Sequence, residues 1–474
     1  MAGNHCNYYS FGVLLMAGVR TKGRDSDMNN YTKTLMKFFL ETEYKDIPIS
    51  AIELAKKHFL DCVGCALAEA AQPRSGIVQR YLDAVGNTGD CRIVGSGRGA
   101  TVEYAAFATG ILAHTICYDD SGPSHPSVTI VPGLLALGEK YHFSGKELLT
   151  AQVLAYDVFQ RLNLVTGEAW DMRVRGWHPS GFFGAVAGAA QASKLLGLDL
   201  KTSQKALGIA ASLGAGLSQN IGNMSMGLHA GNASRNGITA ALLAKEGFTA
   251  DPCPLEGRFG MLDALAGPGG YKIECLTENL GNPFCLLEPG ITIKPYPNCW
   301  AHHKVLQATL ELKAKNSIQA EDVAAVYVDL QKNKPTYRYL LPETDLEARY
   351  SLGYGIAAAL LDGELTLEQY RDERITAPDI RSMISKIVDT PASDSVEQQT
   401  VRIELKDGTV YSNRVQYSKG HPIHDPMTLE ETKEKFRSCA GMLLPKEKVE
   451  ASMDLILNLE NVQDFSKVMD TLVK

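Results

Sequence analysis

The sequence predicts a mostly α-helical protein with an α+β part, built as a large all-helical domain plus a smaller α+β lid domain. The chain has 474 residues, more than one hydrophobic core normally organises, so two domains are expected. Up to about residue 290, apolar residues recur at three- and four-residue intervals, as on the faces of helices. Beyond that point, alternating β-branched segments occur between helical ones, which is typical of an α+β unit.

These changes of pattern also predict the domain boundaries. Residues 30–290 form the helical domain, residues 291–426 form the lid domain, and residues 427–474 return to the helical domain. Residues 1–29 are expected to be a poorly ordered N-terminal extension. Their apolar run FGVLLMAGV has the length of a signal peptide, but no cationic segment precedes it.

The expected helices of the large domain are mostly apolar or small-residue nearly all round, as in helices buried within a large bundle. Ser50 and Ser144 are expected to cap two of them. The expected helices span residues 31–44, 47–70, 75–85, 100–114, 131–141, 144–167, 180–198, 202–219 and 233–247, and residues 91–95 form a short β-like link.

The lid domain is expected to mix strands and helices. The predicted strands span residues 291–296 and 323–331, and the predicted helices span residues 300–316, 346–363 and 428–444, the last returning to the large domain. Gly363 ends the second of these helices. Residues 400–417 predict a hairpin with Asp407 and Gly408 as its turn.

Composition and charge limit the classes of function. Charged residues make up 21% and hydrophobic residues 45% of the chain, as in ordinary globular proteins. The formal net charge of −7 and the pI near 5.9 argue against a nucleic-acid-binding surface. No apolar stretch predicts a membrane span, so neither a nucleic acid nor a membrane is expected as a partner.

The ten cysteines are scattered along the chain without a secretory signature. Reduced thiols are therefore expected rather than a disulfide framework, which favours the cytoplasm, with mitochondria as the alternative location. Cys62 and Cys65 form a C-x-x-C pair, but no second pair stands at zinc spacing. The segment around them is predicted to be a buried helix, where small apolar cysteines are common.

Chemically capable side chains gather in loops between apolar helices. The first such loop contains Asp119, Asp120, Ser121 and His125 around a Gly-Pro break. Loops held by rigid helices often carry catalytic groups. The alternative is a capped loop, in which Asp120 or Ser121 satisfies backbone N–H groups and His125 bonds locally.

The second loop, residues 170–181, places Arg173, Arg175 and His178 before a helix N-terminus. Guanidinium groups beside the free N–H groups of a helix start suit an anion such as a carboxylate. The alternative is an exposed basic loop over a buried tryptophan.

Two further segments contribute candidates. His229 either orients a ligand or caps a helix. Lys294 and Cys299 lie near the predicted domain junction, a favoured place for ligand pockets. His302 and His303 belong to the following helix and are expected to be surface residues.

Motif spacing indicates neither a metal site nor a cofactor site. The chain contains no H-E-x-x-H, no pair of C-x-x-C motifs, no P-loop, no G-x-G-x-x-G after a strand and no G-x-S-x-G elbow. The histidines, arginines and lysine that remain suit proton transfer on a small anionic substrate. No metal and no cofactor are therefore expected.

The sequence resembles the MmgE/PrpD family, which includes 2-methylcitrate dehydratase, cis-aconitate decarboxylase and iminodisuccinate epimerase. The resemblance covers nearly the whole chain after residue 30. It rests on the blocks YDDSGPSHPS, RGWHPSG, GLHAGNASRNGITAALLAKEGFT, IKPYPNC, LEARYSLGYGIAAALLDG and ELKDGT, in the family's order. It implies a large helical domain, a smaller α+β lid, a homodimer, and a cofactor-free site between the domains.

The resemblance carries functional residues onto particular positions of this chain. His125 matches the family's loop histidine, although this loop is about two residues short. His178 matches the second histidine of the decarboxylase, and Lys294 matches the lysine that opens the extended segment. Ser121 stands where the decarboxylase has a threonine.

Three positions depart from the decarboxylase pattern. Cys117 replaces an aspartate, Met226 replaces a lysine, and Cys299 replaces a histidine. The loss of the lysine and the histidine argues against decarboxylation of cis-aconitate. The Gly-Trp-His motif also differs from the one expected in 2-methylcitrate dehydratases, so the substrate stays open.

The sequence thus predicts a cofactor-free lyase, a dehydratase or decarboxylase, for a small di- or tricarboxylic acid such as a citrate or aconitate analogue. The alternatives are an epimerase or isomerase of an iminodisuccinate-like dicarboxylate, and a non-catalytic carboxylate-binding homologue. The expected catalytic residues are His125, His178, Asp119, Asp120 and Cys299. The expected substrate-binding residues are Ser121, Arg173, Arg175, His229, Lys294, Met226 and Tyr337.

Overall fold

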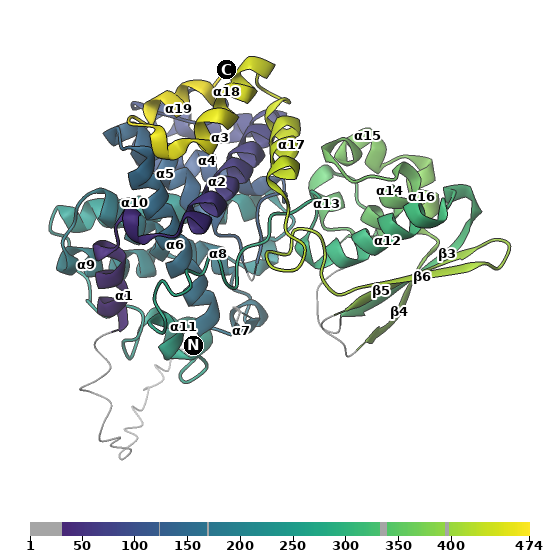
Figure 1. Cartoon of the computed structure of the whole chain (residues 1–474), viewed down its shortest axis with the longest axis horizontal. Coiled ribbons are helices and arrows are strands. Elements are labelled where there is room, and N and C mark those ends of the chain that lie inside the picture. The colour runs from purple at the N-terminus through teal and green to yellow at the C-terminus, as the bar shows by residue number, and fades with distance from the viewer. Residues whose placement is uncertain (1–30, 123, 168–169, 332–338, 394–397) are drawn as a thin grey trace, which may run out of the picture.

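The chain folds into two lobes, which Figure 1 shows side by side. The computed structural model describes residues 31–122, 124–167, 170–331, 339–393 and 398–474. The larger lobe consists almost entirely of helices, and the smaller lobe combines a sheet with helices. The predicted fold class, mostly α with an α+β part, is confirmed. The expectation for residues 1–29 lies outside the described residues.

Most helices of the large lobe overlap the predicted ones, but α7 and α11 were not predicted and α10 begins nine residues before its predicted start. These helices are α1 (Tyr31–Glu41), α2 (Ile49–Ala70), α3 (Gly76–Ala84), α4 (Val102–Thr115), α5 (Ser127–Tyr141), α6 (Gly145–Val165), α7 (Trp170–Val174), α8 (Pro179–Leu195), α9 (Leu200–Leu213), α10 (Met224–Lys245) and α11 (Met261–Ala266). A short antiparallel pair, β1 (Cys91–Arg92) and β2 (Gly99–Ala100), precedes α4. Ser144 caps α6 by accepting from the N–H of Glu147, as predicted. Ser50 does not cap α2, because that helix begins one residue earlier, after Pro48.

Helices α4, α8 and α10 meet at the centre of the large lobe, where glycines permit close approach. A Cβ on Gly231 of α10 would lie 2.4 Å from the carbonyl oxygen of Phe107 in α4. A Cβ on Gly237 would lie 2.5 Å from the carbonyl carbon of Gly188 in α8. A Cβ on Gly227 would lie 2.4 Å from Oγ1 of Thr115, so the end of α4 lies beside the start of α10.

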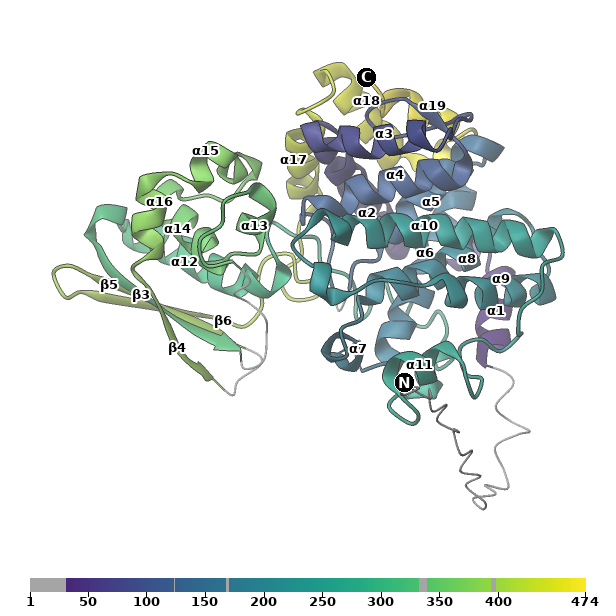
Figure 2. The same cartoon turned by 180° about the vertical axis from the view of Figure 1, so that it is seen from behind.

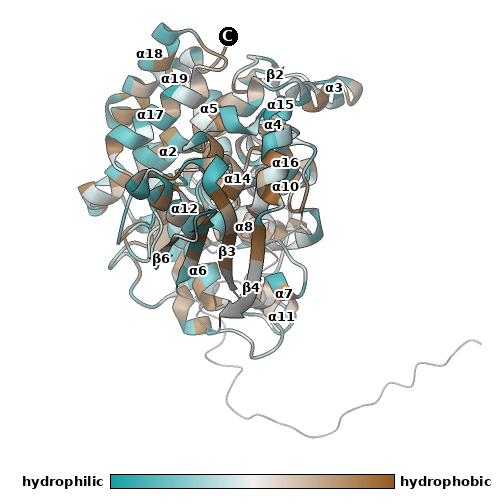
Figure 3. Ribbon diagram, turned by 90° about the vertical axis from the view of Figure 1, so that its right-hand side faces the viewer, coloured by the Kyte–Doolittle hydropathy of each residue, from teal (hydrophilic) through white to brown (hydrophobic). Residues whose placement is uncertain are grey.

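The small lobe is a four-stranded sheet with helices on one face, as Figures 1 and 2 show. Its helices are α12 (His303–Asn316), α13 (Asp345–Arg349), α14 (Leu352–Asp362), α15 (Asp372–Ile375) and α16 (Pro378–Ile384). Its strands, in the spatial order β4-β3-β5-β6, are β3 (Val323–Gln331), β4 (Ile387–Ser393), β5 (Gln399–Leu405) and β6 (Val410–Val415). Figure 3 shows hydrophobic residues along β3, which, like β5, has a partner strand on each side.

The hairpin and helix-end predictions for this lobe are confirmed. Strands β5 and β6 pair antiparallel, and Gly408 in the turn between them has a φ of 86°. Gly363 follows α14 with a φ of 78°, the left-handed conformation that glycine adopts at little cost.

Two strand predictions are wrong. Residues 291–296 do not join the sheet, and Thr292 forms only an isolated bridge with Ser121 of the large lobe. Strand β4 was not predicted, because its sequence IVDTPAS has only two β-branched apolar residues at its start. It forms because its backbone pairs parallel with β3, with Ile387 opposite Val326.

The last three helices, α17 (Leu429–Ala440), α18 (Lys446–Leu457) and α19 (Ser466–Thr471), lie on the large lobe, drawn in yellow in Figure 1. The main hydrophobic core therefore contains residues from Leu35 to Ile291 and again from Phe436 to Leu472. A separate core, from Val305 to Val415, fills the small lobe. None of the described helices has both the length and the apolar character needed to cross a membrane.

Candidate active site

The loop between α4 and α5 contains the acidic residues that organise the site. Cys117, just after α4, has a φ of 53°, which turns the chain sharply before Asp119 and Asp120. Ser121 fixes the next stretch, because its backbone exchanges two hydrogen bonds with Thr292, of 2.8 and 2.7 Å. The loop is therefore attached to the segment that leads into the small lobe.

Asp119 lies between two histidines and is completely buried. Its Oδ2 atom is 3.1 Å from Nδ1 of His114 and 2.9 Å from Nδ1 of His125. Burial alone would raise the pKa of Asp119, but His114, His125 and Lys294 together hold it well below its ordinary value. Asp119 is thus a carboxylate that orients two imidazole rings.

Asp120 faces the opposite way and holds the loop together. Its Oδ2 atom is 3.1 Å from Nδ1 of His58 in α2 and also accepts from the hydroxyl of Ser127 at the start of α5. Its Oδ1 atom accepts from the N–H of Ser127 at 3.3 Å. Asp120 therefore positions the loop, and no histidine of the candidate acid–base pair contacts its carboxylate among the described residues.

His178 reaches the same region from the N-terminus of α8. Its N–H donates to the carbonyl oxygen of Gly216 at 3.0 Å, and its Nδ1 is 3.0 Å from Nδ1 of His229. Burial, together with His114 and His229, lowers the pKa of His178 well below its ordinary value. His229 lies inside α10 and is not a cap, and burial lowers its pKa to about 4.

The rings of His114, His125 and His178 form one cluster. Ring centroids are 4.6 Å apart for His114 and His125, 5.8 Å for His114 and His178, and 6.2 Å for His125 and His178. One nitrogen of each ring lies within 4.8 Å of those of the other two, close enough to share a metal ion. The fold thus assembles a possible metal-ligand set that motif spacing did not indicate.

Sequence reasoning missed His114 and His58. Both lie within helices, His114 in α4 and His58 in α2, and are buried. The signal in the sequence was a histidine in an otherwise apolar helix, because a buried imidazole needs a polar partner. The adjacent carboxylates of Asp119 and Asp120 each supply one.

Lys294 supplies a buried positive charge from the segment between the lobes. Its Nζ donates to the carbonyl oxygen of Cys117 at 3.1 Å and lies 3.6 Å from the Cys117 sulfur. Although burial opposes its charge, Cys117 and Asp119 raise the pKa of Lys294 above its ordinary value. Lys435 of α17 supports this segment by donating to the carbonyl oxygens of Lys294 and Tyr118, at 2.9 and 2.7 Å.

The two loop arginines differ in position. Arg173, in α7, is partly buried, and its Nε has no hydrogen-bond partner within the described parts of the chain. Burial lowers its pKa. Arg175 is exposed, with its guanidinium group beside Gly267. Arg173 is therefore the better placed of the two to bind an anion near His178.

A sulfur-rich apolar cluster lies beside Lys294. Cys117, Met226 and Tyr350 form its buried part, and Ile221, Cys299 and Tyr339 pack against them. The hydroxyl of Tyr350 donates to the Met226 sulfur at 2.9 Å. Burial raises the pKa of Cys299 to about 11, so the thiol is protonated at neutral pH. Tyr337 lies outside the described residues.

His302 and His303 are buried, which corrects their expected surface position. Nδ1 of His302 is 2.6 Å from the side-chain oxygen of Asn298, and Nε2 of His303 is 3.2 Å from the carbonyl oxygen of Asn298. They brace the start of α12 rather than enter the histidine cluster.

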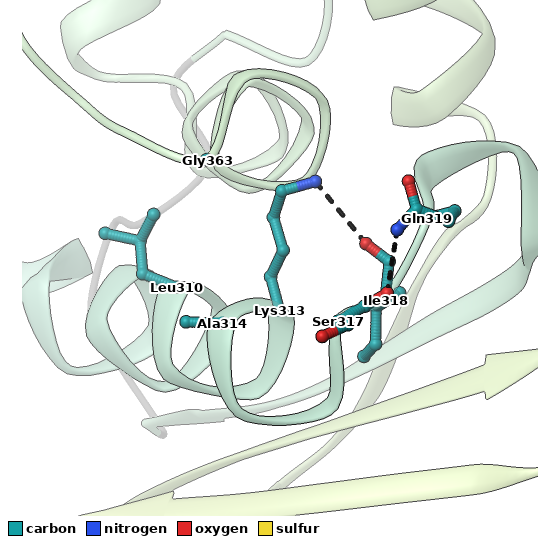
Figure 4. Close-up of a pocket in the computed structure, with 7 residues that line it drawn as sticks. All are labelled: Leu310, Lys313, Ala314, Ser317, Ile318, Gln319 and Gly363. Atoms are coloured by element: carbon teal, nitrogen blue, oxygen red, sulfur yellow. Dashed lines mark hydrogen bonds between the residues drawn. The ribbon is translucent and has the colours of Figure 1, made fainter.

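A surface pocket of about 390 Å³ lies in the small lobe, away from the histidine cluster (Figure 4). Its one cation, Lys313, points at the carbonyl oxygens of Leu360 and Ile318, 2.5 and 3.5 Å away. Since that charge is already bound, the pocket offers less to an anion than the segment around Asp119 and Lys294.

Comparison with known proteins gives consistent matches along the chain. A family model described as the MmgE/PrpD N-terminal domain matches residues 33–274, and one described as the MmgE/PrpD C-terminal domain matches residues 296–461. The chain is 31% identical over 390 residues to a cis-aconitate decarboxylase of Homo sapiens, covering 78% of this chain and 79% of that protein.

More distant relatives align over more of the chain. A cis-aconitate decarboxylase of Aspergillus terreus is 27% identical over 463 residues, covering 90% of this chain and 92% of that protein. A probable 2-methylcitrate dehydratase of Saccharomyces cerevisiae is 24% identical over 457 residues, covering 87% of this chain and 85% of that protein.

Proposed function

Because this chain belongs to the MmgE/PrpD family, we propose that it is a cofactor-free lyase that acts on a small tricarboxylic acid by acid–base catalysis. One observation carries the proposal: a buried carboxylate, Asp119, orients His125, whose ring lies 6.2 Å from that of His178. Two neutral imidazoles beside a buried lysine suit removal and return of a proton next to carboxylates.

His125 is the proposed base. Its Nδ1–H lies between two acceptors, Oδ2 of Asp119 at 2.9 Å and the carbonyl oxygen of Asp120 at 2.8 Å, so its Nε2 keeps the lone pair that accepts a proton. Its side chain is 15% exposed, whereas Asp119 is fully buried, so a substrate reaches the ring rather than the carboxylate. Burial lowers the pKa of His125 despite the opposing effect of Asp119, which keeps the ring neutral and basic at neutral pH.

His178 is the proposed acid. Burial beside other imidazoles holds its pKa well below the ordinary value, so the ring is neutral at rest. We propose that it takes up a proton from water when the anionic substrate binds, and that it gives this proton up readily. In a dehydration that proton goes to the departing hydroxyl. In a decarboxylation it goes to the carbon that loses CO₂. His229, 3.0 Å away, sets the orientation of the His178 ring.

Lys294 and Arg173 are the proposed carboxylate-binding cations. Removing a proton beside a carboxylate places negative charge on its oxygens, and fixed cations stabilise that charge in a buried site. Lys294 already contacts the loop that carries Asp119, and the free Nε of Arg173 is available to an anion.

The apolar cluster favours a substrate with an alkyl substituent. Met226, Cys117 and Tyr350 offer sulfur and ring surface, and none of these three side chains carries a charge that would bind a substrate carboxylate. A 2-alkylcitrate fits such a surface better than an unsubstituted tricarboxylate. This favours dehydration, the reaction named for the Saccharomyces cerevisiae relative, over decarboxylation of cis-aconitate.

The test is incubation of the purified protein in D₂O with citrate, 2-methylcitrate, cis-aconitate and an aspartate-like dicarboxylate, followed by NMR. Loss of water from 2-methylcitrate, absent in His178→Ala, is the expected result. Release of CO₂ from cis-aconitate would support a lyase but overturn the alkyl preference. Exchange at a chiral carbon without loss of water or CO₂ would show an isomerase instead. If none of these acids reacted, the catalytic proposal would be wrong.

A further inference from the structure

We propose that His114, His125 and His178 bind a divalent transition-metal ion of the Zn²⁺ class, which blocks proton transfer while it is bound. One nitrogen from each ring lies within 4.8 Å of the other two. Neutral imidazole is a common ligand for such ions, and three histidines leave a fourth position open for water or a carboxylate. The binding itself does not depend on the proposed function, whereas the inhibition does.

Asp119 prepares two of the ligands. Its carboxylate lies 3.1 and 2.9 Å from Nδ1 of His114 and His125, which fixes both rings with Nδ1–H as donor and Nε2 free. Metal-bound histidines almost always have such a carboxylate or carbonyl partner behind them. Asp119 thus orients two rings toward one region, whereas a histidine with only a structural role would need one partner of its own.

The strongest sign of a missing ligand is on His114. This ring is completely buried, yet its Nε2 has no hydrogen-bond partner among the described residues. Leaving a buried nitrogen without a hydrogen-bond partner is unfavourable, so such atoms usually bind something. Substrate access through His125 leaves His114 deeper in the site, where a small ion reaches it more readily than a tricarboxylate does.

His178 completes the set from a different helix. Its Nδ1 is 3.0 Å from Nδ1 of His229, and when Nδ1 of His178 carries the proton, its Nε2 has a lone pair that can bind a metal ion. Its ring centroid lies 5.8 Å from that of His114 and 6.2 Å from that of His125. With Zn–N bonds of about 2.0–2.1 Å, a tetrahedral site needs nitrogens about 3.4 Å apart, so the three rings must move closer together when the ion binds.

The charges of Lys294 and Asp119 affect how tightly a metal ion binds to the three histidines. Lys294 lies near Asp119 and opposes a second positive charge, while Asp119 offsets it. The ion would take the lone pair of His125 that the proposed base needs. Zn²⁺ is therefore expected to inhibit turnover, and a chelator is expected to restore it.

The experiment is equilibrium dialysis of the metal-free full-length protein against Zn²⁺, with Co²⁺ absorption as a report of tetrahedral coordination. Wild type is expected to bind one ion per chain. His114→Gln is expected to weaken binding by about 100-fold, and Asp119→Asn by about 10- to 100-fold, as for other outer partners of metal ligands. His142→Gln, which changes an exposed histidine 3.1 Å from Asp464, should bind like wild type.

Equal binding by His114→Gln and wild type would overturn the site. So would loss of the ion in His421→Gln instead, since His421 and His424 form a separate ring pair with centroids 4.8 Å apart. If His114→Gln fails to fold by circular dichroism, His178→Gln replaces it in the same comparison. A negative result leaves the NMR test of turnover unaffected, so the two proposals fail separately.

Discussion

At the scale of single residues, the site depends on which side chains share a carboxylate. Asp119 and Asp120 are neighbours in sequence but face different histidines, His114 and His125 for the first and His58 for the second. The first carboxylate orients the proposed base, and the second fixes the loop. Adjacent identical residues therefore have different roles, which only their partners distinguish.

Replacement of His178 by alanine is expected to lower kcat about 10²- to 10⁴-fold, the usual contribution of a general acid or base. Cys299→Ala is expected to cost much less, because burial raises the pKa of that thiol to about 11 and keeps it protonated. Both variants are measured on the substrate that the NMR panel identifies. A reversed ranking would make a thiolate the base and remove His178 from the mechanism.

Acidification is expected to destabilise the protein through its buried histidines. The pKa of His229 is about 4 in the folded chain and about 6.5 in the unfolded chain. Between these two pH values the unfolded chain binds more protons than the folded chain. The contribution of His229 to the free energy of unfolding is therefore fully present above about pH 6.5 and is lost as the pH falls toward 4. The lowered pKa values of His125 and His178 act in the same direction.

The check is the midpoint of urea unfolding at about pH 7.5 and about pH 5 for wild type and His229→Asn. The variant should lose less stability on acidification, because one buried imidazole no longer resists protonation. An equal or larger loss in the variant would show that other groups control the acid sensitivity.

At the scale of secondary-structure elements, the close packing of α10 against α4 at glycine residues positions the helices around the candidate site. Gly231→Ala is expected to destabilise the protein by about 1–3 kcal/mol, because its Cβ would lie 2.4 Å from the Phe107 carbonyl oxygen and force α10 away from α4. Gly353→Ala in α14 is the matched control, since its nearest neighbour, Ile384 Cγ2, would be 3.6 Å away. Helix propensity alone would make both changes stabilising.

Thermal and urea unfolding of the two alanine variants provide the comparison. Gly353→Ala should have an unfolding midpoint equal to or above that of the wild type. Equal stability of both variants would mean that the α4–α10 contact is not tight.

At the scale of the whole molecule, Lys435 links the returning helices to the site. Its Nζ lies 2.5 Å from Asp61 of α2 and donates to the carbonyl oxygens of Tyr118 and Lys294. Lys435→Met should cost about 3–5 kcal/mol, because it leaves the buried Asp61 carboxylate without its cation.

The double variant Asp61→Asn with Lys435→Met should recover part of that stability, since no charge is then left unpaired. Turnover should stay low in both, because the carbonyl oxygens of Tyr118 and Lys294 lose their common donor. Full activity in the folded double variant would show that Lys435 only stabilises the fold.

A homodimer remains a proposal for the assembly. Exposed apolar side chains lie where α9 leads into α10, namely Leu213, Leu217, Met224 and Leu228. Their burial against a second copy would remove them from water. Sedimentation of the full chain should show a dimer at micromolar concentration, and a stable monomer would contradict it.

The sequence alone was enough to predict most of the helices, the hairpin and the family resemblance, and it proposed Asp119, His125 and His178 as loop residues of the site. These features depend on apolar periodicity, turn residues and local motifs, which neighbours in the chain specify. The tertiary structure decided what the chain order does not encode. It placed His114 and His58 on the two carboxylates, buried His302 and His303 around Asn298, and paired β4 with β3. It also joined residues 291–296 to the Asp119 loop instead of the sheet, because backbone groups of Ser121 and Thr292 satisfy each other there. Most of these pairings join residues far apart in the sequence, so no local pattern predicts them.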